Sequence, residues 1–135
     1  MIVILCDGSS KGNPGPASTG VVAWDRTSNP KLMRPSYKHR VDIGIATSIE
    51  AEWHALLSAM EYALAKDKDQ DIYIFSDSQT IVKQAKGIWK VKNERIKRIY
   101  GLFTVLKKQL PDIHIDWVPR QLVSLADKLA QGGAE

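Results

Sequence analysis

Short apolar runs separated by polar turns recur along the chain and predict a mixture of strands and helices. The stretch 2–8 is almost unbroken apolar until it ends in Asp7 and Gly8, which is typical of a strand buried at the centre of a sheet. Residues 8–16 are turn-formers and are expected to form a loop. A second strand at 20–24 and a third within 32–45 then predict an antiparallel meander.

The pattern changes to a helical period after the meander. Thr47-Ser48-Ile49-Glu50 matches a capping box, and apolar residues recur at helical spacing from there through about Ala65. The other expected elements are a buried strand at 72–75, a helix at 79–86, a helix stopped by Pro111, an edge strand at 113–117 and a last helix with apolar residues from 122 to 130.

Composition places the chain in a broad class. Its 135 residues suffice for one domain, 1–135, with a sizeable core. The formal net charge of +4 is compatible with a polyanionic partner. Cys6 is the single cysteine, which excludes an intrachain disulfide. No apolar stretch approaches membrane-spanning length, so we expect a soluble cytoplasmic protein without membrane contact.

Four acidic residues stand where apolar elements meet polar segments. Asp7 and Asp77 each follow a buried strand, Glu52 lies in the first turn of a helix, and Asp127 lies in the last helix. Ordinary alternatives stay open: a turn aspartate for Asp7, a helix cap for Asp77 and Asp127, and a solvated carboxylate for Glu52. If the two buried strands are parallel neighbours, Asp7 and Asp77 lie side by side.

Carboxylates gathered around one concavity have a recognised chemistry. Mg²⁺ takes oxygen ligands and keeps several waters, and two such ions can support phosphodiester hydrolysis without any histidine or thiolate. The four acidic residues are therefore candidates for a two-metal site.

A basic segment follows the second predicted helix. Residues 87–93 contain Trp89, Lys90 and Lys92, with further cations on both sides and only Glu94 opposing them. Such a charge run is either a solvated face or, given the interleaved aromatic residue, a contact surface for nucleic acid.

Four segments together resemble the type 1 ribonuclease H family. They come in the family's order and spacing and span essentially the whole chain: Asp7 to Pro16, Thr47 to Trp53, Ser76 to Gln79, and Ala126 to Ala130. Val91-Lys92-Asn93 is also similar to a recurring piece of the family.

The resemblance implies an α/β fold of the ribonuclease H type. Such a fold has a five-stranded mixed sheet in the order 3-2-1-4-5, with helices on both faces. It also implies an endonuclease that cleaves the RNA strand of an RNA–DNA hybrid with two Mg²⁺ ions, or with Mn²⁺ in their place. We expect this enzyme to act as a monomer.

The resemblance further implies roles for single residues. Asp7 would bridge both metal ions, Glu52 would also contact the 2′-hydroxyl side of the cut site, and Asp127 would hold the metal that carries the attacking water, with Asp77 completing the set. The positions that match nucleic-acid contacts are Asn13, Thr47, Ser48, Trp89, Lys90, Lys92 and Asn93.

Some positions depart from the family pattern. Ser48 and Ile49 stand where two asparagines usually read the minor groove, and the side chain of Ile49 neither donates nor accepts. Val123 replaces an asparagine, and Arg120 is the nearest candidate to substitute for a histidine that many members carry. Three functions stay open: a ribonuclease H, an integrase-like or resolvase-like nuclease of the same fold, and a non-catalytic nucleic-acid-binding domain.

Overall fold

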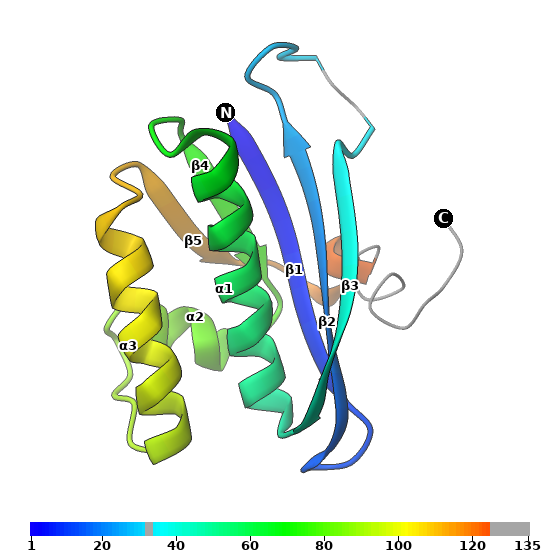
Figure 1. The fold of residues 1–135 in the computed structure, drawn as a ribbon, viewed down its shortest axis with the longest axis vertical. Helices are drawn as coiled ribbons and strands as arrows, with labels where there is room; N and C mark the ends of the chain where they lie inside the picture. The colour runs from blue at the N-terminus through cyan, green and yellow to red at the C-terminus, as the bar shows by residue number, and fades with distance from the viewer. Residues whose placement is uncertain (32–33, 125–135) are drawn as a thin grey trace.

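A five-stranded mixed sheet forms the centre of the protein (Figure 1). The computed structural model describes residues 1–31 and 34–124. The strands lie in the order β3-β2-β1-β4-β5, as the family resemblance implied. Their bounds are β1 Ile2–Ser10, β2 Gly15–Asp25, β3 Tyr37–Ala46, β4 Ile72–Ser76 and β5 Ile113–Trp117.

The predicted meander is confirmed, but its strands are longer than the sequence pattern indicated. β1 pairs with β2 along its whole length, and Gly8, Ser9 and Ser10 lie opposite Thr19, Ser18 and Ala17. The predicted loop 8–16 is therefore wrong at both ends, and only residues 11–14 connect the two strands. Pairing with a neighbouring strand outweighs the weak turn preferences of glycine and serine at these positions.

Three helices pack together on one face of the sheet (Figure 1). They are α1 Ser48–Asp67, α2 Gln79–Ala85 and α3 Glu94–Lys108. The predicted capping box is confirmed, because the Thr47 hydroxyl accepts from the Glu50 N–H while the Glu50 carboxylate accepts from the Thr47 N–H. The buried core of Ile2, Ile4 and Cys6 from β1 packs against α1 residues such as Trp53 and Leu56.

Residues 120–124 are helical and begin to cover the other face of the sheet. Leu122 lines the same hollow as Val3 and Leu5, which alternate along β1 with the residues facing α1. The rest of the predicted last helix lies outside the described residues. In the part of the chain that the structure describes, no helix is long and apolar enough to cross a membrane.

Candidate metal centre

The register of two parallel strands brings Asp7 and Asp77 together. β1 pairs with β4 in parallel, and the last paired residues are Leu5 and Phe75. Two residues further on in each chain segment, an aspartate follows at the carboxyl-terminal end of this pairing, Asp7 after Leu5 and Asp77 after Phe75. β4 ends at Ser76 while β1 continues beside β2. Asp7 therefore projects where its β4 neighbour has ended, which is why it is a site residue and not a turn residue.

A close contact between β1 and α1 brings the third carboxylate to the same place. Gly8 lies against the backbone of α1, and a Cβ atom at this position would overlap the backbone of Ala51 and Glu52. The absence of a side chain at Gly8 thus allows the first turn of α1 to lie directly on the strand beside Asp7. Sequence reasoning treated Gly8 as a turn residue and missed this function.

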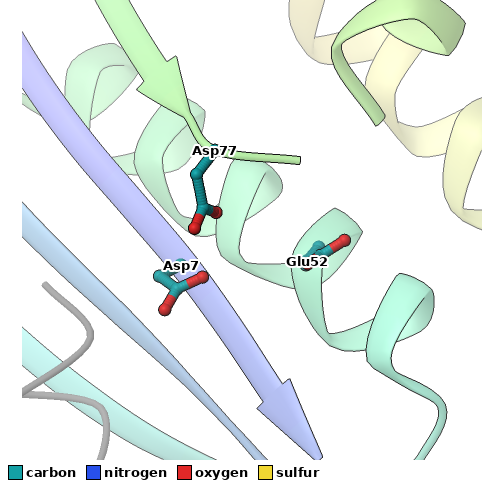
Figure 2. Close-up of side chains that lie close together, drawn as sticks. All are labelled: Asp7, Glu52 and Asp77. Atoms are coloured by element: carbon teal, nitrogen blue, oxygen red, sulfur yellow. The ribbon is translucent and has the colours of Figure 1, made fainter. Parts of the chain in front are cut away.

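Asp7, Glu52 and Asp77 form one cluster (Figure 2). One carboxylate oxygen from each residue lies within 4.8 Å of the other two. The Asp7 residue is buried, with 3% of its surface exposed, while the other two are half-buried. Asp127, the fourth predicted member, lies outside the described residues.

The negative charge of the cluster shifts the pKa values of groups in and beside it. Burial raises the pKa of Glu52 above its usual range, and the nearby Asp77 carboxylate raises it further, while a hydrogen bond with Ser78 and the Arg120 charge lower it. The pKa of the buried Cys6 thiol is also raised, first by burial and then by all three carboxylates. Cys6 is therefore an inert thiol and not a ligand or nucleophile.

Arg120 brings a positive charge to the cluster through an ion pair with Asp77. Its Nη1 lies 3.2 Å from Asp77 Oδ2, and its side chain is 66% exposed while that of Asp77 is 9% exposed. The residue that the family resemblance suggested as a histidine substitute thus lies at the cluster. An arginine stays protonated at any physiological pH, so it supplies positive charge but no proton transfer.

The donor set of the cluster fits a divalent cation. It offers carboxylate oxygens, as hard cations such as Mg²⁺ prefer, and no described histidine or thiolate competes for the ion. Three mutually close carboxylates that are partly removed from water are unstable without positive charge nearby, and a bound cation relieves that repulsion.

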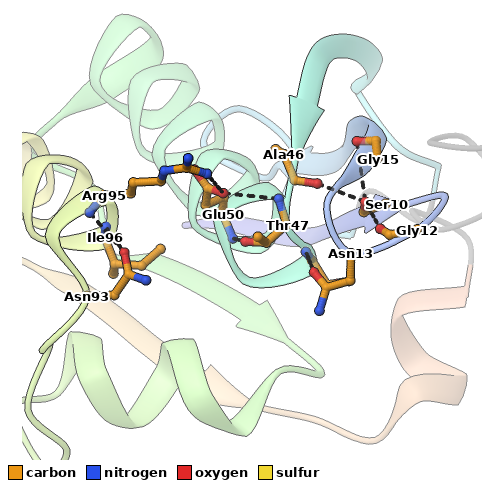
Figure 3. A network of polar contacts seen from close by, with 11 residues as sticks. Ser10, Gly12, Asn13, Gly15, Ala46, Thr47, Glu50, Asn93, Arg95 and Ile96 are labelled. Carbon is orange, nitrogen blue, oxygen red and sulfur yellow. Dashed lines mark hydrogen bonds and ion pairs between the residues drawn. The ribbon is translucent and has the colours of Figure 1, made fainter.

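A network of polar contacts links four of the predicted nucleic-acid-binding residues, Asn13, Thr47, Ser48 and Asn93, across the starts of α1 and α3 (Figure 3). Asn13 Oδ1 accepts from the Ser48 N–H at 3.1 Å, which ties the β1–β2 loop to the start of α1. Ser10 supports the same loop, since its hydroxyl donates to the carbonyls of Gly12 and, at 2.8 Å, of Ala46. Asn13, Thr47 and Ser48 therefore form one continuous surface.

The same network reaches the start of α3. Arg95 Nη1 lies 3.7 Å from Glu50 Oε1 and joins the first turns of α1 and α3. Asn93 caps α3, because its Oδ1 accepts from the N–H groups of Arg95 and Ile96 at 2.9 and 3.2 Å. Asn93 thus has a structural role that sequence reasoning did not assign, and its amide nitrogen is the group left to donate outward.

The basic loop 87–93 displays its aromatic residue and lysines on the surface. Trp89 is 45% exposed, and Lys83 Nζ lies 4.6 Å from the centroid of its ring. Lys90 and Lys92 are exposed as well. The side chain of Trp89 therefore lies partly on the surface and is not packed into the core.

Two departures from the family pattern have a packing explanation. Ile49 lies in the first turn of α1, is half-buried and packs against the hydrophobic core, and Val123 is completely buried. Both positions thus contribute apolar contacts where the family usually has a hydrogen-bonding amide. Ser48 keeps a backbone link to Asn13.

The chain matches the family model described as reverse transcriptase-like over residues 5–133. Among curated proteins, it is 35% identical over 129 residues to a bifunctional protein of Mycobacterium tuberculosis, a match that covers 96% of the chain and 34% of that protein. It is 36% identical over 124 residues to ribonuclease HI of Halobacterium salinarum, covering 92% of the chain and 59% of the relative. The chain thus spans about a third of the mycobacterial relative.

A solved structure supports the same relationship. The crystal structure of LC11-RNase H1 in complex with an RNA/DNA hybrid superposes with a TM-score of 0.87 at 31% sequence identity. The match covers 98% of this chain and 96% of that one. The similarity therefore extends over the whole sheet and its helices.

Proposed function

The chain belongs to the reverse transcriptase-like family of ribonuclease H domains, and from that premise we propose that it is a metal-dependent endonuclease that cuts the RNA strand of RNA–DNA hybrids. Residues 1–135 form one ribonuclease H domain in this proposal. The enzyme acts as a monomer in the cytoplasm and uses two Mg²⁺ ions, with Mn²⁺ as an alternative.

The convergence of Asp7, Glu52 and Asp77 is the observation that carries the proposal. Three separate elements contribute one carboxylate each, and their oxygens approach within 4.8 Å. A domain that only binds nucleic acid gains nothing from buried acids that repel phosphate. This arrangement therefore favours catalysis over a purely binding function.

The three carboxylates, with Asp127 as the proposed fourth, would hold the cations. Bound Mg²⁺ would supply a nucleophilic water at neutral pH and charge neutralisation for the phosphodiester. Glu52 must lose its proton before it can bind a cation, and its raised pKa makes this step pH-dependent. Activity should therefore fall on acidification at a higher pH than an unperturbed glutamate would give.

Arg120 supplies fixed positive charge beside Asp77. Many family members carry a histidine at this place. We assign Arg120 only the charge-stabilising role of that histidine, because a guanidinium stabilises a developing oxyanion without transferring a proton. The proton required by the leaving oxygen comes from solvent in this scheme.

The surface around Asn13, Thr47 and Ser48 holds the substrate on one side of the cluster, and loop 87–93 holds it on the other. Phosphate contacts from Lys90, Lys92 and Asn93 position the DNA strand, and Trp89 offers a flat surface to a sugar or base. The inward packing of Ile49 removes one hydrogen-bonding group that would read the minor groove. We therefore expect weaker discrimination between hybrid and other duplexes than in members that carry asparagine there.

A cleavage assay on matched duplexes tests the proposal. The purified protein is incubated with an RNA–DNA hybrid, a double-stranded RNA and a double-stranded DNA of one sequence, each with Mg²⁺ and with EDTA. The proposal predicts Mg²⁺-dependent cuts in the RNA strand of the hybrid and much slower cleavage of the other two. Preferential cleavage of DNA would instead favour an integrase-like nuclease, and binding without any cleavage would favour the non-catalytic alternative.

A further inference from the structure

The end of β5 and the segment that follows it are hydrogen-bonded to the end of β4 at the metal centre. Ser76 and Trp117 are the last paired residues of these two strands. The Val118 N–H then donates to the Ser76 carbonyl at 3.0 Å, beyond the end of the regular ladder. Trp117 and Val118 therefore follow the backbone of β4 to its last residue, next to Asp77.

The side chain of Trp117 adds a hydrogen bond to Asp77 itself. Its indole Nε1–H donates to the main-chain carbonyl of Asp77 at 3.0 Å. The residue is 45% exposed, so its burial gives less stabilisation than that of a core tryptophan such as Trp53, which is fully buried. A large aromatic side chain at the exposed end of an edge strand is better explained by the polar contact that it makes.

The contact adds a second hydrogen bond to the peptide plane that follows Asp77. On the C-terminal side, the Ser78 N–H donates to Ser76 Oγ at 3.1 Å, and Ser78 Oγ caps α2 by accepting from the Ile81 N–H. On the side-chain side, Arg120 meets the carboxylate at 3.2 Å. The Asp77 carbonyl accepts from the indole, so both polar groups of the peptide plane that follows Asp77 are hydrogen-bonded and the plane is fixed in orientation.

We propose that Trp117 is a positioning residue of the metal centre, acting through its hydrogen bond to the Asp77 carbonyl, and this inference rests on the proposed function of the carboxylate cluster. Holding the peptide plane restricts the backbone of Asp77 and hence the direction of its carboxylate towards Asp7 and Glu52. Mg²⁺ requires near-ideal octahedral geometry, so its affinity depends on such orientation.

The test compares two tryptophans that are equally exposed. Trp117→Phe removes the indole N–H, and Trp89→Phe makes the same chemical change at a residue that is also 45% exposed but contacts Lys83 instead of the cluster. Mn²⁺ affinity is measured by isothermal titration calorimetry without nucleic acid, together with the melting temperature. We expect Trp117→Phe to weaken Mn²⁺ binding about 10-fold, the lower end of the effect of outer ligand partners, and Trp89→Phe to leave it unchanged.

A kinetic measurement separates positioning of the metal ligand from contact with substrate. Trp117→Phe should lose hybrid cleavage at low Mg²⁺ and recover most of it at high Mg²⁺, with KM for the hybrid unchanged.

If Trp117→Phe does not fold, Trp117→His serves in its place at pH 8, because histidine keeps a ring N–H. The Trp117→His variant should then bind Mn²⁺ more tightly than a Trp117→Leu variant of equal stability.

Two results would overturn the inference. Unchanged Mn²⁺ affinity in folded Trp117→Phe excludes the positioning role, and equal weakening in Trp117→Phe and Trp89→Phe reduces it to a general loss of aromatic surface. The proposed function fails separately: a wild-type protein that binds Mn²⁺ but cuts no hybrid would refute the ribonuclease activity and leave the assignment of Trp117 standing.

Discussion

Glu50 and Glu52 show how two acids in one helical turn acquire opposite properties. The Glu50 carboxylate accepts a hydrogen bond from the Thr47 N–H, which is the main reason why its pKa lies below the usual range. Glu52 points to the cluster, and burial raises its pKa. The first residue therefore stabilises the helix start, while the second is held in place by the rest of the fold despite its cost.

The two glutamates should accordingly give opposite phenotypes. Glu50→Gln keeps the hydrogen bond of the capping box but loses charge beside the helix N-terminus and Arg95, so we expect about 0.3–1 kcal/mol less stability and near-normal cleavage. Glu52→Gln should leave a stable protein that has lost Mn²⁺ affinity and cleavage. Thermal unfolding and a hybrid cleavage assay on both variants check this, and exchanged phenotypes would contradict our assignment of the site.

The pH dependence of stability follows from the same two shifts. The raised pKa of Glu52 means that the metal-free folded protein holds this proton more tightly than the unfolded chain does, so stability falls as pH rises from 4.5 through the folded pKa. The lowered pKa of Glu50 stabilises the fold above pH 4.5, and that contribution is lost as pH falls through the folded pKa. Urea unfolding of the metal-free protein across pH should show a decline above pH 4.5 that Glu52→Gln removes; a decline unchanged in that variant would contradict the assignment.

Gly8 controls the distance between β1 and α1. Gly8→Ala places a methyl group where the α1 backbone lies, so we expect a loss of about 1–3 kcal/mol and weaker Mn²⁺ binding as Glu52 moves away from Asp7. Gly101→Ala is the control, because a Cβ atom at this exposed position in α3 meets nothing within 4 Å. The control should gain up to about 1 kcal/mol from helix propensity, and Mn²⁺ binding by Gly8→Ala that equals that of wild type would refute the close-contact argument.

At the scale of elements, strand register and helix starts determine the site. The capping box of α1 follows from a sequence pattern, and the parallel pairing of β1 with β4 was implied by the family resemblance; together they bring three carboxylates close to one another. The lengths of β1 and β2, and the hydrogen bonds from Trp117 and Val118 to the end of β4, depend on neighbours that are distant in sequence. Local preferences therefore could not predict that residues 8–10 pair with β2, or that Trp117 contacts Asp77.

Loop 87–93 should act as a separate binding element. Each phosphate contact by lysine lowers the logarithm of affinity by about 0.7–0.9 per logarithmic unit of salt, so Lys90→Ala with Lys92→Ala should flatten the slope by about two contacts. The matched control replaces Lys107 and Lys108, exposed lysines at the other end of α3, roughly 22 Å along the helix axis. Binding titrations of hybrid at several salt concentrations decide the matter, and equal slopes in the two double variants would leave loop 87–93 as a solvated face.

At the scale of the whole molecule, charge is divided between the centre and the surface. The anionic cluster, buried at Asp7 and half-buried at Glu52 and Asp77, lies within a protein of net charge +4, and the cations of loop 87–93 and the start of α3 are exposed. The surface charge attracts a polyanion, while the cluster requires cations before a phosphate can approach it. Attraction of nucleic acid and cleavage are therefore carried by different residues and can be separated by mutation.

The most direct test of the central claim is Mg²⁺-dependent cleavage of a hybrid by folded Asp7→Asn. The amide is nearly isosteric with the buried carboxylate but carries no charge, so the variant should fold, melt no lower than wild type without metal, and still bind hybrid through loop 87–93. Loss of several kcal/mol of metal-assisted stabilisation predicts a drop in turnover of about 10³-fold or more. Turnover within about tenfold of wild type, a barrier change of only about 1.4 kcal/mol, would contradict the account, because the buried carboxylate of Asp7 could not then be essential to the metal centre.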